Sequence, residues 1–353
     1  MTERGQALRI SIVHPEREAR ERWRRVLKAR LPQAQVGTWS RPRAAARTAA
    51  GAAAGAAASD PAEANLRTDG GASEHAPPAS PAVTHFGVGW KPPLAFFAEH
   101  PELAAFFAAG AGVDHLLGLD GLPPHLPIIR LEDAGMADQM FTYCLHEILR
   151  RVTRADEYEA SQRAGRWCER QARPAGDLRI GVLGMGALGG ELARRLAALG
   201  FQVSGFARGP HAVAGVSCHH GAAQWPDFLA RSDVLVLMAP LTADTRGLID
   251  ARALAALPPG AWLINVARGA LIDEPALLAA LAGGRLAGAT LDVFQTEPLP
   301  GDHPFWQHPS IRLTPHVAAQ TLIEPSARQV ADKILRLQQG ESVSGIVSRQ
   351  RGY

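Results

Sequence analysis

The sequence predicts an α/β protein of two domains, each built on an open parallel sheet. Its length of 353 residues indicates about two domains at roughly 100–200 residues each. Short, continuous runs of Val, Ile and Leu alternate with helical patterns, which is typical of parallel strands that helices cover on both faces. A composition of 46% hydrophobic and 20% charged residues fits a globular protein with a sizeable core, and it excludes a fibrous or fully disordered chain.

The first half opens with a strand–helix–strand pattern that one unusual segment interrupts. Residues 8–14 and 33–39 have the apolar character of strands, and the apolar residues of 16–30 recur near helical spacing. Residues 40–82 are rich in Ala, Gly, Ser and Pro, with no aromatic residue and one large aliphatic side chain, Leu66. Such a segment buries too little apolar area to offset its ordering entropy, so we expect a disordered insertion.

The pattern resumes after the insertion and becomes regular in the second half. Strands and turns are predicted in 81–93, 103–117 and 126–133, and a helix in 136–154. A second helix ends at about Trp167, and a linker follows at 171–177. From residue 178, helices alternate with the apolar strands LRIGVLG, FQVSGFA, SDVLVLMAP, AWLINVA, LAGATLDV and SIRLTPHV. The last predicted element is an amphipathic helix at 324–339, ended by Gly340.

Composition also argues against several function classes. No apolar run reaches the roughly 18 residues of a membrane span, and the charged N-terminus does not resemble a signal peptide, so we expect a cytoplasmic protein. Three cysteines, none in a CxxC pair, exclude a disulfide scaffold. A net charge of +3 does not indicate nucleic-acid binding. Cys218, His219 and His220 are contiguous and lack the usual ligand spacing, so no metal site is expected.

The motif GMGALGG gives the first chemical signal. Gly184, Gly186 and Gly189 form a GxGxxG pattern between a predicted strand and a predicted helix, the context that a dinucleotide-binding turn requires. The first glycine permits a tight turn, the second lets the backbone approach a pyrophosphate, and the third lets the helix pack on the strand. The free N–H groups of the helix N-terminus attract that anion. The alternative is a glycine-rich turn of some other α/β protein.

The end of the next strand predicts which cofactor binds. A free ribose hydroxyl usually meets an acidic residue about 20 residues after the glycine motif. Here position 207 is alanine, Arg208 follows, and no Asp or Glu lies between Glu191 and Asp227. An arginine beside the ribose suits a 2′-phosphate through charge-assisted hydrogen bonds. We therefore expect NADPH as the preferred cofactor and NADH as a second one; an ordinary surface arginine is the alternative.

Three further motifs place chemical groups just after strands. They are Arg268 in VARGALIDE, Asp292 and Glu297 in LDVFQTEPLP, and His316 in TPHVAA. Ligands of open α/β sheets bind beyond the carboxyl ends of the strands, so these loops should meet near the glycine-rich turn. A histidine supplies a proton near neutral pH, a carboxylate beside it orients the ring and favours its charged form, and an arginine binds a carboxylate. Each residue alone has a structural alternative, but together they predict reduction of a 2-oxo acid.

The chain resembles the D-isomer-specific 2-hydroxyacid dehydrogenase family, and within it the glyoxylate/hydroxypyruvate reductase A group. The resemblance is carried by GAGVDHLL, RLEDAGMADQM, GVLGMGALGG, NVARGALIDE, LDVFQTEPLP, PFWQHP, TPHVAA and RGY. It implies a flavodoxin-like substrate domain made of 1–134 plus 320–353, a Rossmann cofactor domain at 135–319, and an active site in the cleft between them. It also implies a homodimer. The segment 40–82 is the one departure from the group's pattern.

The resemblance further implies roles for single residues. Arg268 would bind the substrate carboxylate, His316 would donate the proton, and Glu297 would pair with His316. The substrate site would be completed by the backbone of Ala111 and Gly112 and by the side chain of Trp90. The residues expected around the cofactor are Gly184, Gly186, Ala187, Leu188, Gly189, Arg208, Pro240, Thr245, Ala267, Asp292 and Ala318, with Asp292 at the nicotinamide carboxamide.

These observations predict an NADPH-dependent reductase of glyoxylate or hydroxypyruvate. Two alternatives stay open: another member of the family, such as a D-lactate or phosphoglycerate dehydrogenase, and a dinucleotide-sensing protein on the same fold, like the family's transcriptional corepressors. The expected partners are a small 2-oxo acid and a second copy of the chain, with no nucleic acid and no membrane. A turnover assay separates an enzyme from a sensor, because a sensor would bind cofactor with only trace reduction.

Overall fold

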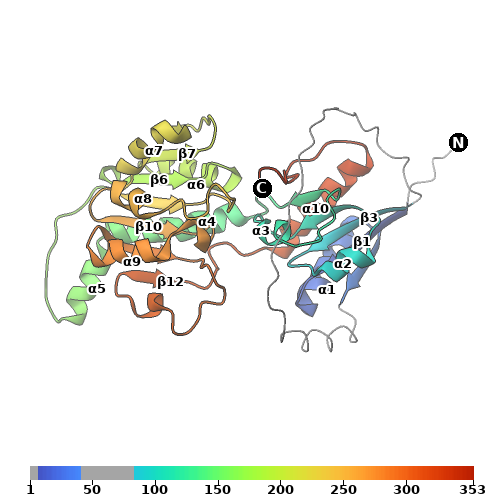
Figure 1. The fold of residues 1–353 in the computed structure, drawn as a ribbon, viewed down its shortest axis with the longest axis horizontal. Coiled ribbons are helices and arrows are strands. Elements are labelled where there is room, and N and C mark those ends of the chain that lie inside the picture. Colours follow the sequence, from blue (N-terminus) through green and yellow to red (C-terminus); the bar gives the residue numbers. More distant parts are fainter. Residues whose placement is uncertain (1–6, 41–82) are drawn as a thin grey trace, which may run out of the picture. The chain divides into compact units, whose positions relative to one another are not determined.

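The computed structural model describes residues 7–40 and 83–353, which form two α/β units, each with its own sheet (Figure 1). The predicted disordered insertion lies outside the described residues, apart from residue 40. The fold class predicted from the sequence, two parallel-sheet α/β units, is confirmed.

The division into units follows contacts between residues. Of the described residues, 7–40, 83–107 and 119–128 form one compact unit, and 108–118 and 129–353 form the other. By this criterion the C-terminal residues group with the second unit, whereas the sequence assigned 320–353 to the first domain. The predicted domain boundaries therefore stay a prediction.

The first unit holds a five-stranded sheet. Its strands are β1 (Ala7–Val13), β2 (Gln35–Trp39), β3 (Val83–Gly89), β4 (Leu103–Ala108) and β5 (Ile128–Arg130), in the spatial order β2-β1-β3-β4-β5. β1 pairs in parallel with both β2 and β3. The order 2-1-3-4-5 is that of flavodoxin-like sheets, as the family resemblance implied for the first domain.

Two helices accompany this sheet, α1 (Arg17–Arg30) and α2 (Leu94–Glu99), whereas α3 (Asp114–Leu117) lies in the segment 108–118 of the other unit. On α1 the buried residues are Ala19, Trp23 and Leu27. These residues recur every fourth position and so share one face of the helix, which explains why the periodicity of 16–30 predicted this element.

A buried histidine joins β1 and β3 to the start of β4. His85 lies opposite Arg9 in the parallel pairing, and its Nε2 is 2.9 Å from the hydroxyl of Ser11. Its Nδ1 is 2.6 Å from a carboxylate oxygen of Glu102. Burial lowers the pKa of His85, although the hydrogen bond with Glu102 opposes that effect. Among the described residues, His85, His100 and Glu102 form a cluster whose ligand atoms are close enough together to hold a metal ion. The hydrogen bonds with Ser11 and Glu102 already satisfy both nitrogens of a neutral His85 ring.

The second unit holds a seven-stranded sheet. Its strands are β6 (Arg179–Leu183), β7 (Gln202–Ala207), β8 (Val216–His220), β9 (Val234–Leu237), β10 (Ala261–Asn265), β11 (Leu286–Leu291) and β12 (Ile311–Leu313), in the order β12-β11-β10-β9-β6-β7-β8. All the strand pairs are parallel. Counted from β6, this is the Rossmann order 3-2-1-4-5-6 with one more strand at the edge, and the order reverses between β6 and β9.

Helices cover both faces of this sheet. One face is covered by α4 (Met136–Val152) and α6 (Ala187–Ala198), and the other by α7 (Gly221–Ala230), α8 (Ala251–Ala256) and α9 (Glu274–Ala282). The helices α5 (Ala155–Arg163) and α10 (Ile323–Gln338) also belong to this unit but contribute no residue to either core. One core contains buried residues of α4 and α6 with Val234 and Val236, and the other contains residues of α7, α8 and α9 with Leu235 and Leu237. Successive residues of β9 thus enter opposite cores, which explains its continuous apolar sequence.

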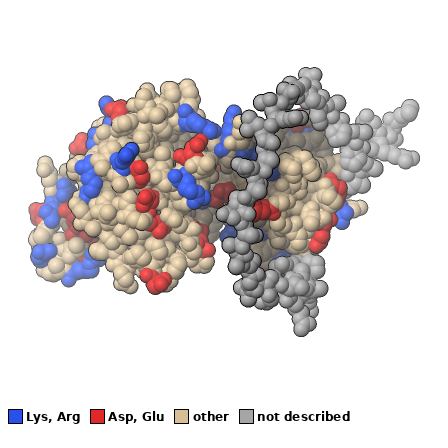
Figure 2. Space-filling model, viewed as in Figure 1, with Lys and Arg blue, Asp and Glu red and all other residues tan. Residues whose placement is uncertain are grey.

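Surface properties agree with the composition. Acidic and basic side chains are interspersed over the visible face of the second unit (Figure 2). Among the described residues, no helix is both long and apolar enough to cross a membrane.

Candidate active site

The glycine-rich turn between β6 and α6 has the geometry that its sequence predicted. Gly184 has φ +102°, and a Cβ there would lie 2.5 Å from the backbone nitrogen of Ala239. A Cβ on Gly189 would lie 1.9 Å from the carbonyl oxygen of Gly184. Larger residues are therefore excluded at both positions, the first by its turn and the second by close packing of helix and strand.

The same turn is open where an anion would bind. No atom lies within 4 Å of a Cβ placed on Gly186. Gly186 is the N-cap of α6, and no side chain caps the helix. The first N–H groups of α6, which include those of Ala187 and Leu188, are therefore available to an anion in the way that a pyrophosphate requires. The turn thus fits the diphosphate of a dinucleotide.

The end of β7 lies beside this turn. The N–H of Gly184 donates a hydrogen bond to the carbonyl of Phe206, at 2.8 Å. Ala207 is buried, and the exposed Arg208 follows it with its guanidinium against the ring of Tyr353, 5.3 Å from the centroid. A basic side chain, and no carboxylate, therefore follows the strand where the sequence analysis expected the 2′-phosphate.

The loop after β9 packs against the glycine-rich turn through Ala239 and is held by a threonine. The hydroxyl of Thr245 donates to the carbonyl of Pro240 at 2.7 Å and accepts from the N–H of Thr242 at 2.8 Å. Thr245 therefore fixes the shape of the loop that the sequence analysis placed along the cofactor.

Arg268 lies in the loop after β10, and its guanidinium reaches the 110–114 turn. Its Nε donates to a carboxylate oxygen of Asp114 at 2.8 Å, and its Nη1 donates to the carbonyl of Ala267 at 2.6 Å. A Cβ on Gly112 would lie 1.6 Å from Nη2 of Arg268. The turn that was predicted to hold a carboxylate through Ala111 and Gly112 thus lies against Arg268.

One part of this guanidinium stays available. Within residues 7–40 and 83–353, Nη2 of Arg268 has no hydrogen-bond partner, and the side chain keeps about a quarter of its surface exposed. An arginine held at Nε and Nη1 in this way is oriented before any ligand arrives, with N–H groups left for an anion. The arrangement suits recognition of a small carboxylate.

Local packing brings the Arg268 loop to the loop that carries Glu297. A Cβ on Gly269 would lie 2.0 Å from the carbonyl carbon of Phe294, so only glycine allows this approach. The buried Asn265 fixes the loop further, donating to the carbonyl of Arg268 at 2.9 Å and accepting from the N–H of Ala267 at 3.1 Å.

His316 and Glu297 form the predicted pair. Nδ1 of His316 is 2.7 Å from Oε2 of Glu297, and Oε1 of Glu297 accepts from the N–H of Phe294 at 3.0 Å. A carboxylate accepts hydrogen bonds, so Nδ1 carries the proton and donates. Nε2 of His316 has no hydrogen-bond partner in the described part of the chain, and the ring is partly exposed. The ring is therefore oriented by Glu297 while its second nitrogen stays available.

The backbone of His316 has a left-handed conformation, with φ +56°. This conformation is uncommon for residues other than glycine. Two hydrogen bonds oppose the strain: the N–H of His316 donates to the carbonyls of Asp292, at 2.8 Å, and Thr314, at 3.0 Å. Non-glycine residues in this region often occur at functional sites, where surrounding contacts fix the side chain direction.

Asp292 forms the framework of the histidine loop. It is buried, its Oδ1 accepts from the hydroxyl of Thr314 at 2.6 Å and the N–H of Val317 at 2.8 Å, and its Oδ2 accepts from the N–H of Ala318 at 2.9 Å. The structure thus gives Asp292 a role in positioning His316. Its predicted contact with a nicotinamide carboxamide, and that of Ala318 with the cofactor, stay predictions.

The structure adds residues that the sequence analysis did not single out. Asp114 orients Arg268, and the hydroxyl of Tyr143 is 2.6 Å from that of Thr314. Burial raises the pKa of the Tyr143 phenol, so it is neutral and able to donate. A sequence signal existed for Asp114, an acidic residue inside the conspicuous GAGVDHLL turn, but none distinguished Tyr143 on a helix face.

Trp90 belongs to the other unit. It follows β3, its N–H donates to the carbonyl of Val13 at 3.0 Å, and its side chain is partly buried. Its predicted role in closing the substrate pocket stays a prediction.

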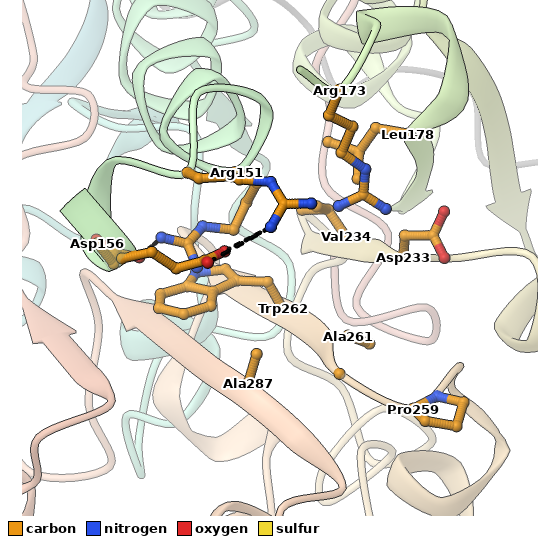
Figure 3. A pocket seen from close by; sticks show the side chains of 13 residues that line it. Arg151, Asp156, Arg173, Leu178, Asp233, Val234, Pro259, Ala261, Trp262 and Ala287 are labelled. Carbon is orange, nitrogen blue, oxygen red and sulfur yellow. Dashed lines mark hydrogen bonds and ion pairs between the residues drawn. The ribbon is translucent and has the colours of Figure 1, made fainter. Parts of the chain in front are cut away.

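A cavity of about 220 Å³ lies at the amino-terminal ends of strands of the second sheet (Figure 3). It is lined near the first residues of β6, β9 and β10, by Leu178, Val234 and Ala261 among others. Figure 3 shows Arg151 facing Asp156 there, and the guanidinium of Arg151 lies 3.7 Å from the ring centroid of Trp262. None of the predicted site residues lines it, because they follow the carboxyl ends of the strands.

Comparison with protein families agrees with this geometry. The NAD-binding domain of the D-isomer specific 2-hydroxyacid dehydrogenases matches residues 145–318. A glyoxylate/hydroxypyruvate reductase A from Serratia proteamaculans is 38% identical over 98% of this chain and 100% of its own length. One from Klebsiella pneumoniae is 40% identical over 76% of this chain and 87% of its own.

Solved structures agree as well. A D-isomer specific 2-hydroxyacid dehydrogenase from Xanthobacter autotrophicus, in complex with NADPH and MES, has a TM-score of 0.82 at 38% identity, covering 99% of this chain and 100% of that chain. An NADPH-dependent glyoxylate/hydroxypyruvate reductase from Sinorhizobium meliloti, in complex with NADP and sulfate, has a TM-score of 0.80 at 30% identity, covering 98% and 99%. With its glycine-rich turn and its arginine, glutamate and histidine loops, this chain belongs to the D-isomer specific 2-hydroxyacid dehydrogenase family.

Proposed function

We propose that this protein reduces a small 2-oxo acid with NADPH, converting glyoxylate to glycolate and hydroxypyruvate to glycerate. The observation that carries the proposal is the pairing of an oriented acid with an oriented anchor. His316 is held through Nδ1 by Glu297, and Arg268 is held through Nε and Nη1 by Asp114 and Ala267. Relatives named glyoxylate/hydroxypyruvate reductase A support the substrate class.

NADPH is the proposed cofactor because the chain offers the groups that it needs. The uncapped start of α6 and the open side of Gly186 suit the pyrophosphate. Arg208, next to the buried Ala207, suits the 2′-phosphate. Neighbouring structures carry NADPH or NADP. Bound there, the cofactor supplies a hydride for the carbonyl carbon of the substrate.

The residues of the chain supply the rest of the chemistry. Arg268 neutralises the substrate carboxylate through the N–H groups that Asp114 leaves available, which orients the neighbouring carbonyl. His316, in its protonated form, gives the Nε2 proton to the carbonyl oxygen as negative charge develops there. Glu297 accepts the hydrogen bond from the Nδ1–H of His316 and holds the ring orientation throughout, which stabilises the imidazolium before the transfer. One hydride and one proton are consumed for each 2-hydroxy acid formed.

A turnover panel tests the proposal. Glyoxylate, hydroxypyruvate, pyruvate and 3-phosphohydroxypyruvate are each offered with NADPH and with NADH, and loss of reduced nicotinamide is followed. The proposal expects the highest kcat/KM for glyoxylate or hydroxypyruvate with NADPH. Preference for the phosphorylated acid or pyruvate would move the protein to another branch of the family, and cofactor binding without turnover would indicate a sensor.

We also propose that the protein is a cytoplasmic homodimer. The dimer is supported by apolar surface near α5: Trp167 is 91% exposed, and Tyr158 and Leu149 are about 40% exposed. Large aromatic side chains in such positions are typical of protein interfaces. Sedimentation of the purified protein tests the dimer, and cell fractionation tests the location.

A further inference from the structure

The residues Ser348–Tyr353 form a closed turn, called here the tyrosine turn. The N–H of Ser348 donates to the carbonyl of Tyr353 at 3.1 Å, and the N–H of Gly352 donates to the carbonyl of Ser348 at 2.9 Å. Gly352 has φ +79°, a conformation that glycine adopts without strain. The side chain of Tyr353 is therefore carried by a defined backbone.

The tyrosine turn contacts two loops of the seven-stranded sheet. On one side, Nη2 of Arg208 donates a hydrogen bond to the hydroxyl of Tyr353, and the guanidinium lies 5.3 Å from the ring centroid. On the other side, a Cβ on Gly352 would lie 3.2 Å from Cγ2 of Thr242. Arg208 follows β7, and Thr242 is in the loop after β9.

These two loops flank the glycine-rich turn. In the sheet, β6 lies between β7 and β9, and Gly184 touches the ends of both neighbours, through Phe206 and Ala239. The tyrosine turn thus connects the loops on either side of the glycine-rich turn, next to the point between β6 and β9 where the strand order reverses. Ligands of open α/β sheets bind at that point.

The partner of Arg208 is informative. In the described part of the chain, Arg208 forms no ion pair with a carboxylate, and the hydroxyl of Tyr353 is its hydrogen-bond partner. A tyrosine hydroxyl accepts one hydrogen bond and can donate another at the same time. Arg208 and Tyr353 together therefore present two donors to an anion, with the ring of Tyr353 holding the guanidinium in place.

We propose that Tyr353 is a residue of the 2′-phosphate subsite, where its hydroxyl donates to the phosphate beside Arg208. This inference rests on the proposed use of NADPH and adds a residue from the tyrosine turn that determines cofactor specificity. It requires that removal of the Tyr353 hydroxyl weakens the binding of NADPH and leaves the binding of NADH, which lacks the phosphate, nearly unchanged.

The test compares dissociation constants for NADPH and NADH, measured by nicotinamide fluorescence in the wild type, in Tyr353→Phe and in Tyr158→Phe. Tyr353→Phe keeps the ring and removes the donor, and a hydrogen bond to a charged group is worth about a factor of ten in affinity. The Kd for NADPH should therefore rise about tenfold, with the Kd for NADH changing less than about twofold. Tyr158, a partly exposed tyrosine on α5, is the matched control and should leave both constants unchanged.

Two further measurements sharpen the result. Adenosine 2′,5′-bisphosphate and AMP differ only by the 2′-phosphate, and Tyr353→Phe should weaken the first and spare the second. The double variant Arg208→Gln/Tyr353→Phe should lose less NADPH affinity than the product of the single losses, because both residues bind one group.

The outcomes separate this inference from the proposed function. A wild type that binds NADPH no better than NADH overturns the proposed cofactor and this inference together. A wild type that prefers NADPH, with Tyr353→Phe unchanged or weakened equally for both cofactors, overturns this inference alone. A loss of affinity in Tyr353→Phe for NADPH but not for NADH, with thermal unfolding unchanged, supports the inference.

Discussion

The substitution Gly112→Ala tests how Arg268 is positioned without altering any group that takes part in the chemistry. The added Cβ would lie 1.6 Å from Nη2 of Arg268. The nearest atoms are the far end of a flexible side chain and not backbone, so the guanidinium would retreat by about 2 Å to reach an ordinary contact distance. That movement breaks its alignment with Asp114, which Nε now contacts at 2.8 Å.

The expected effect is on substrate recognition and not on folding. A misplacement of this size in a carboxylate anchor lowers kcat/KM by about 10- to 100-fold. The free energy of unfolding should change by less than about 1 kcal/mol, because no backbone clash is created and alanine also restricts the unfolded chain.

The assay is steady-state reduction of glyoxylate with NADPH, with thermal unfolding measured in parallel. Gly301→Ala is the control, because no atom lies within 4 Å of a Cβ at that glycine, and its kinetics should match the wild type. If Gly112→Ala keeps kcat/KM within about threefold of the wild type while Arg268→Gln loses activity, the position of Arg268 against the 110–114 turn is not used in catalysis.

Three further predictions concern cofactor, pH and assembly. Ala207→Asp should shift the NADPH/NADH ratio of kcat/KM toward NADH by at least about tenfold, because the carboxylate repels the 2′-phosphate and accepts from a free ribose hydroxyl; an unchanged ratio would refute the assignment. Burial lowers the pKa of His85, so below about pH 6.5 the unfolded chain binds a proton that the folded chain excludes, and the free energy of unfolding should fall by at most about 1.4 kcal/mol for each pH unit of acidification. In urea unfolding at pH 7 and 5.5, His85→Asn should lose less of this free energy than the wild type or the control His125→Asn. Equal losses in the three proteins would contradict the prediction. Trp167→Ser should weaken the proposed dimer in sedimentation at low concentration while leaving thermal unfolding of each subunit similar, and a monomeric wild type would refute the dimer.

The strands and helices that the sequence predicted best are those with a strong apolar pattern. β9 and β10 are buried on both faces, and their unbroken apolar runs identify them. β8 was missed because its residues, VSCHH, are mostly polar, and they are partly buried or exposed at the sheet edge. A pattern method detects burial, and an edge strand has little of it.

For the candidate site too, some contacts could be predicted from the sequence and others could not. Motif position was enough to predict that the loops of Glu297 and His316 meet, because both follow strand ends of one sheet, and the family resemblance implied the pair that the structure contains. The contacts of Asp114 with Arg268 and of Tyr353 with Arg208 were not predictable, since 154 and 145 residues separate the partners. Such contacts depend on how a turn packs in three dimensions, which local spacing does not encode. Trp90 and the cofactor contacts of Asp292 stay predictions.

The role of His316 is the central claim, and His316→Ala tests it most directly. General acid catalysis contributes about 10²- to 10⁴-fold to the rate. In single-turnover reduction of glyoxylate by bound NADPH, the variant should therefore lose at least about 100-fold in rate, while its Kd for NADPH, measured by fluorescence, stays within about twofold of the wild type. A variant that retains more than about a tenth of the wild-type rate would show that the proton comes from another group, and a wild type that binds NADPH without oxidising it would show that the protein is not this reductase.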